Sequence, residues 1–108
     1  MEDRIPTHLI VSSILRLCAV KAVPAYVLHK GEAESGTIIV KVVMRGQGCV
    51  LQNQSRDIDG NLVWQNVFEE SVIDEPRADA YIQRSRARDP DVWVVEIEDS
   101  QGANPFSV

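Results

Sequence analysis

The sequence predicts a single α+β domain built as three layers, with a mixed, largely antiparallel five-stranded sheet and one helix on each face. Three observations lead to this prediction. The chain has 108 residues, which is enough for one hydrophobic core but not for two. The strands predicted at 37–44 and 92–97 are apolar on both faces, so both faces of the sheet centre must be covered. Two segments, 6–22 and 75–88, have the periodicity of helices that could cover them.

The first helix is predicted over residues 6–22. Pro6 suits the first turn, where its missing N–H costs no hydrogen bond. Apolar residues then recur at helical spacing, from Ile10 and Ile14 to Cys18. Pro24 ends the helix, because the residue before a proline is pushed out of the α region.

Five strands follow from runs of β-branched and aromatic residues, at 25–30, 37–45, 49–54, 62–68 and 92–98. The acidic segment between Gly31 and Gly36 is interpreted as a hairpin turn, and Asp59-Gly60 is a strong hairpin signal. Strands one to four should therefore form an antiparallel meander. The fifth should enter the middle of the sheet or pair with the first.

The second helix is expected to begin after Asp74, a good N-cap residue, and to run to about Arg88. Asp89-Pro90 ends it. Residues 1–108 thus form one domain, in which we expect 1–5 and 102–108 to be frayed.

Composition excludes several classes of function. The net charge of −5 argues against nucleic acid and anionic membranes as partners, because both attract basic surfaces. No segment approaches the length of a membrane span, and the apolar run 9–23 lacks the flanks of a secretory signal. Cys18 and Cys49 should be buried free thiols. We expect a soluble, cytoplasmic protein without a cofactor.

The acidic end of the last strand is the strongest candidate for chemistry. Glu96 and Glu98 are two residues apart, so their side chains share one face about 7 Å apart. Together with Asp91 they could bind Mg²⁺ or Mn²⁺ in a metal-dependent hydrolase or nuclease. The favoured interpretation is structural, with both glutamates paired to Arg84 and Arg88, which share a helix face. No arrangement of residues predicts a catalytic side chain.

Two features favour an interaction surface instead. Trp64 lies on a weak strand expected at a sheet edge, and tryptophan is enriched where proteins bind one another. Arg84 and Arg88 give the second helix a charged face. The leading hypothesis is a non-enzymatic interaction or accessory module that binds a protein partner or self-associates through the edge of the fourth strand.

Four local patterns resemble a known family. They are the opening 4–9, the turn 31–36 that leads into 39–42, the helix start 78–82 and the closing run 89–99. This combination resembles the small alphaproteobacterial proteins grouped as domain-of-unknown-function family fourteen-ninety-one, over nearly the whole chain. The resemblance implies an intracellular bacterial single domain. It implies no activity, cofactor, partner or site residue.

Overall fold

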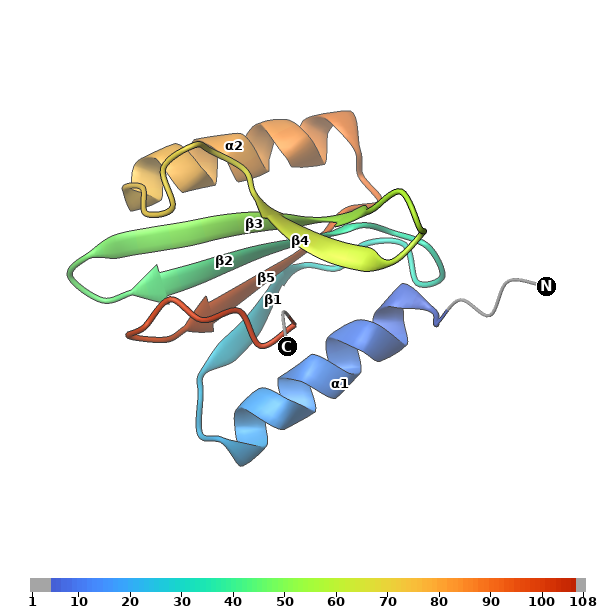
Figure 1. Ribbon diagram of the computed structural model, residues 1–108, viewed down its shortest axis with the longest axis horizontal. Coiled ribbons are helices and arrows are strands. Elements are labelled where there is room, and N and C mark those ends of the chain that lie inside the picture. Colours follow the sequence, from blue (N-terminus) through green and yellow to red (C-terminus); the bar gives the residue numbers. More distant parts are fainter. Residues whose placement is uncertain (1–4, 107–108) are drawn as a thin grey trace.

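The structure is a computed structural model, and it describes residues 5–106. Two helices and five strands form one three-layer α+β domain, which confirms the predicted fold class (Figure 1). In chain order the elements are α1 (Thr7–Val20), β1 (Ala25–His29), β2 (Ile38–Met44), β3 (Gly48–Arg56), β4 (Leu62–Asn66), α2 (Glu75–Arg88) and β5 (Trp93–Glu98).

The sheet has the strand order β1-β5-β2-β3-β4. β5 lies between β1 and β2, antiparallel to the first and parallel to the second. Both predicted placements of this strand are therefore found, because β5 lies inside the sheet and also pairs with β1. The predicted four-strand meander was wrong at its first step, since only β2, β3 and β4 follow one another as antiparallel neighbours.

The segment between Gly31 and Gly36 is accordingly a crossover and not a hairpin turn. Both glycines lie against the backbone carbonyl of Asp91, just before β5, and a Cβ on either would collide with that oxygen. The Glu32 N–H donates to the Asp91 carbonyl at 2.9 Å. The indole Nε1–H of Trp93 donates to the Glu32 carbonyl at 2.8 Å. The glycines thus let the crossover lie directly on the start of β5.

The same crossover holds the beginning of α1. The first helical N–H groups have no partner within the helix. Here the N–H of Thr7 donates to the Glu34 carbonyl at 3.1 Å, and that of His8 donates to the Ala33 carbonyl at 2.9 Å. Pro6 is the N-cap residue, so the helix begins one residue later than predicted, and it ends at Val20 and not at Ala22.

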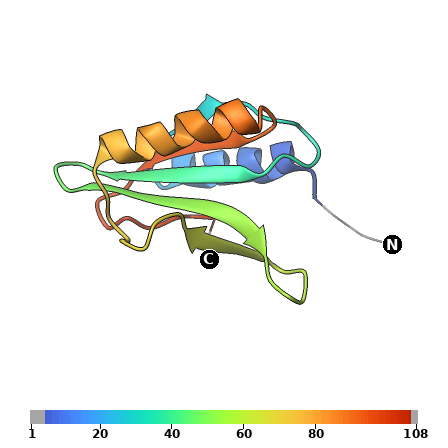
Figure 2. The ribbon, with the colours of Figure 1, turned by 90° about the horizontal axis from the view of Figure 1, so that it is seen from above.

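The two helices cover opposite faces of the sheet (Figure 1). Side chains alternate along β5, so that Trp93, Val95 and Ile97 pack in the core on the α1 side, while Val94 packs on the α2 side. Trp93 is only 4% exposed, which agrees with the prediction that both faces of this strand are covered. The tip of the β3–β4 hairpin projects away from these layers (Figure 2).

The end of the described chain folds back over the sheet. Asn104 is buried and donates from Nδ2 to the Gln52 side-chain oxygen at 2.8 Å. The ring of Phe106 lies 5.1 Å from that of Trp64. Of the termini that we expected to be frayed, 102–106 therefore has defined packing, while 1–4 and 107–108 lie outside the described residues.

Candidate functional site

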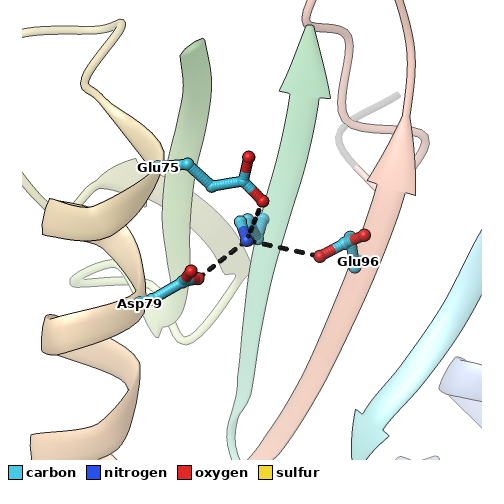
Figure 3. A network of polar contacts seen from close by, with 4 residues as sticks. Glu75, Asp79 and Glu96 are labelled. Carbon is cyan, nitrogen blue, oxygen red and sulfur yellow. Dashed lines mark hydrogen bonds and ion pairs between the residues drawn. The ribbon is translucent and has the colours of Figure 1, made fainter. Parts of the chain in front are cut away.

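Lys41 lies in the middle of β2 and is only 2% exposed. Its Nζ atom is 2.7 Å from Glu75 Oε2, 2.7 Å from Asp79 Oδ1 and 3.3 Å from Glu96 Oε1 (Figure 3). A buried ammonium is costly unless it is paired and hydrogen-bonded, and these three carboxylates meet that requirement.

The surroundings of Lys41 keep it charged. Burial by itself would lower the pKa of the ammonium, but the hydrogen bonds to Asp79 and Glu75 and the charge of Glu96 outweigh it. The pKa of Lys41 is therefore raised above its ordinary value of 10.5. A lysine that acts as a nucleophile or general base needs the opposite shift, which supplies a neutral amine. The three ion pairs of Lys41 instead use its ammonium to connect α2 with the central strands.

The sequence carried a signal for this cluster that we did not use. A lysine in a strand covered on both faces must find acidic partners, and Glu75 and Asp79 stand four residues apart on one side of α2. Lys41 and Glu96 are direct neighbours in the β2–β5 register. The cluster thus ties α2 to the two central strands.

Glu96 and Glu98 line an open cleft of about 890 Å³ at the end of the sheet. Glu98 is 3.7 Å from the guanidinium of Arg45, whose side chain is almost fully exposed. The further carboxylates that line the cleft belong to Asp74, Glu75 and Asp99. Its lining is therefore strongly acidic, with Arg45 as its basic residue.

The predicted pairing of Glu96 and Glu98 with Arg84 and Arg88 was wrong. α2 presents the two arginines on the side away from β5, the side on which Tyr81 packs edge-on against Phe68. Helical periodicity places Arg84 three residues and Arg88 seven residues after Tyr81, on that same side. The glutamates instead pair with Lys41 and Arg45, as described above.

The three candidate metal ligands do not form one site. Asp91 precedes β5, whereas Glu96 and Glu98 stand at its other end, so the strand separates them by about 20 Å. Glu96 is also engaged by Lys41. Among residues 5–106, no group of three His, Cys, Asp or Glu side chains is placed to hold a metal ion. The geometry gives no support to a metal-dependent hydrolase or nuclease.

Trp64, Arg84 and Arg88, the residues predicted for interaction, lie on opposite faces of the sheet. β4 is an edge strand, as expected, but Trp64 is half-buried against Phe106 and the core on the α1 side. Arg84 and Arg88 belong to α2, which covers the opposite face of the sheet. These three side chains therefore do not make one surface.

The other edge strand, β1, has an apolar surface that sequence reasoning missed. Three consecutive residues are exposed, with Tyr26 at 49%, Val27 at 38% and Leu28 at 47%. β1 pairs with β5 on one side, and in the described part of the chain no strand lies on its other side. A β-bulge between Val27 and His29 shifts the register and brings Leu28 to the wall of a hollow on the α2 side.

A groove runs between β1 and α2. Its two adjoining hollows have volumes of about 370 and 360 Å³, and Gln83 and Arg86 line both. The first hollow is mainly apolar, and its other lining residues are Leu28, Pro76, Asp79, Ala80, Ile82 and Val94. The second is completed by His29, Ala87 and Pro90.

His29 has a fixed orientation at this groove. Its Nδ1 atom lies 2.7 Å from the carbonyl oxygen of Val92. A carbonyl can only accept a hydrogen bond, so Nδ1 carries the hydrogen and Nε2 is left for another partner. The groove thus has one mainly apolar compartment and one with polar groups.

Comparisons with known proteins identify relatives of this fold. A family model described as "Protein of unknown function (DUF1491)" matches residues 5–107. The crystal structure of a DUF1491 family protein from Caulobacter crescentus CB15 has a TM-score of 0.83 and 34% identity, with 94% of each chain covered. The NMR structure of a DUF1491 family protein from the same organism has a TM-score of 0.83 and 33% identity, with 99% of this chain and 96% of that one covered.

The solution structure of protein Atu0922 from A. tumefaciens shares the fold, with a TM-score of 0.74 and 24% identity over 90% of this chain and 87% of that one. No curated protein matches the chain. Neither helix in the described residues has the length and apolar character needed to cross a membrane.

Proposed function

The chain belongs to the DUF1491 family, whose description gives no function, and we propose that it is an interaction module that binds a partner protein along β1 and the adjoining groove. The observation that carries this proposal is the run of exposed apolar residues Tyr26, Val27 and Leu28 on an edge strand. Natural edge strands are normally protected by charges or coverage, so an apolar edge favours an interface.

The addition of an extended segment to the sheet edge is a mode of recognition that fits this surface. An extended segment can add to a free sheet edge through backbone hydrogen bonds, and its side chains then enter neighbouring pockets. The bulge at Leu28 shortens the regular part of the edge. Side-chain contacts in the groove would therefore contribute much of the specificity.

Both walls of the groove, β1 and α2, are held to the central strands of the sheet. β1 pairs with β5, and the Glu98 N–H donates to the Pro24 carbonyl at 2.9 Å, just before β1 begins. The opposite wall of the groove is α2, which Lys41 ties to the sheet. A preorganised surface of this kind loses little conformational entropy when a partner binds.

We test the proposal with a charge placed in the surface. Leu28→Glu puts a carboxylate at the mouth of the groove, whereas Ile58→Glu makes a comparable change at the exposed tip of the β3–β4 hairpin. Wild-type protein used as bait in an extract of its own cells should recover a stoichiometric partner. Leu28→Glu should lose that partner, and Ile58→Glu should keep it.

Circular dichroism and thermal melts of both variants would show that each is folded. Recovery of the same partner by Leu28→Glu would contradict the proposal. So would a wild-type protein that recovers no partner under gentle conditions.

A further inference from the structure

Of the two charged side chains that line the apolar hollow of the β1–α2 groove, one is paired within the part of the chain that the structure describes and the other is not. Asp79, the acidic residue of the mainly apolar hollow, is engaged by Lys41 at 2.7 Å. Arg86, which lines both hollows, forms no ion pair within residues 5–106. The groove thus offers an unpaired guanidinium beside an apolar compartment, on a protein whose net charge is −5.

We propose, resting on the function proposed above, that the partner is an extended acidic segment in which an apolar residue is followed two positions later by Asp or Glu. Side chains at i and i+2 of an extended chain share one face about 7 Å apart. One would fill the hollow lined by Leu28, Ile82 and Val94, and the other would bind Arg86 in the adjoining hollow.

The chemistry of the second hollow suits a carboxylate. The guanidinium of Arg86 can donate two parallel hydrogen bonds to its oxygens. The side-chain amide of Gln83 lines the same hollow and supplies another donor. An apolar side chain alone would leave these donors without a partner.

A second copy of this chain fits the groove less well. The exposed residues of another β1 would be Tyr26, Val27 and Leu28, none of which carries a negative charge. A second copy of this strand therefore offers no carboxylate to the guanidinium of Arg86. Charge complementarity therefore favours an acidic partner of different sequence.

Peptide titrations of the ¹⁵N-labelled full chain test this inference directly. One probe is acetyl-Thr-Leu-Thr-Glu-Thr-amide, and the matched probe has Lys in place of Glu. The Glu peptide should shift the amide signals of Leu28, His29, Gln83 and Arg86. It should bind about tenfold more tightly than the Lys peptide, the preference expected from one charge-assisted contact.

Reversing the charge of the groove sharpens the test. Arg86→Glu should invert the preference, so that the Lys peptide binds more tightly. Arg84→Glu makes the same charge change on the other side of α2 and should leave the preference unchanged. Both side chains are exposed, so both variants should keep the spectrum of a folded protein.

Failure of this inference can be told apart from failure of the proposed function. Equal affinity for the two peptides, or no saturable shift at millimolar peptide, would overturn the acidic partner. An unchanged preference in Arg86→Glu would also overturn it. The proposed binding surface would still stand in those cases if Leu28→Glu, but not Ile58→Glu, loses the cellular partner.

Discussion

Lys41 is the residue on which the arrangement of α2 over the sheet depends most clearly. Its ammonium is buried, whereas the side chains of Glu75 and Asp79 are about half exposed. Removing the lysine leaves carboxylates that can turn toward water, but removing its partners would leave a charge inside the protein. The cost of breaking the cluster should therefore differ between its two sides.

Replacing Lys41 tests this cluster and its pH dependence. Lys41→Met should lower the free energy of unfolding by about 1–3 kcal/mol at neutral pH, because three carboxylates lose their shared cation while the hydrophobic stem is preserved. The pKa of Lys41 is higher in the folded protein than its ordinary value of 10.5. Its stabilisation is therefore fully present below that pH and is lost as the pH rises through the folded-state pKa.

Urea melts of wild type and Lys41→Met between neutral and alkaline pH would measure this effect. The difference between the two proteins should be constant up to about pH 10 and should shrink above it. A difference that grows in alkali would contradict the assignment of Lys41 as a charged, paired group.

At the residue scale, the sequence could predict which side chains of a strand are buried. It could not predict which charged side chains pair with one another. The burial of Trp93 followed from the two-residue period of a doubly covered strand. The partners of Glu96 and Glu98 depend on which strand lies beside β5 and on how α2 is rotated. Arg84 and Arg88 were chosen because they are near in sequence. The partner of Glu96 is Lys41, because β2 lies beside β5 and places the two residues opposite one another.

At the scale of elements, the crossover 31–36 determines the topology. Flanking glycines and acidic residues looked like a hairpin turn, yet the same residues serve a close approach to the backbone before β5. Local turn signals cannot distinguish the two cases, because the distinction depends on a strand some 60 residues away. By contrast, the existence and approximate bounds of all seven elements followed from hydrophobic periodicity.

The crossover makes Gly36 more sensitive to substitution than a glycine in an open turn. Gly36→Ala places its Cβ against the Asp91 carbonyl and the backbone of Glu32, so backbone atoms must move. We expect a loss of about 3 kcal/mol. Gly46→Ala is the matched control, with φ of +80° but no atom near the added Cβ, and should cost about 1 kcal/mol.

Thermal or urea melts of the two variants give the comparison. Equal losses for Gly36→Ala and Gly46→Ala would contradict the close approach of the crossover to β5.

At the scale of the whole molecule, the two sheet edges differ in character. At β4, the ring of Phe106 packs against Trp64 and covers part of its surface. At β1, the apolar residues lie beside a groove that the described chain leaves open. The sequence analysis placed the interaction at the edge of the fourth strand, whereas our proposal places it at β1. The sequence could not predict that Phe106 would pack against Trp64 at the fourth strand.

Hydrogen–deuterium exchange of the protein, alone and with its captured partner, tests the central claim most directly. Backbone amides in a strand that gains a neighbour exchange more slowly. We predict new protection in the peptide that covers residues 25–30 and in the segment of α2 around Arg86, with no change at the β3–β4 tip. Protection confined to β4 or to the acidic cleft, with β1 unchanged, would contradict the account.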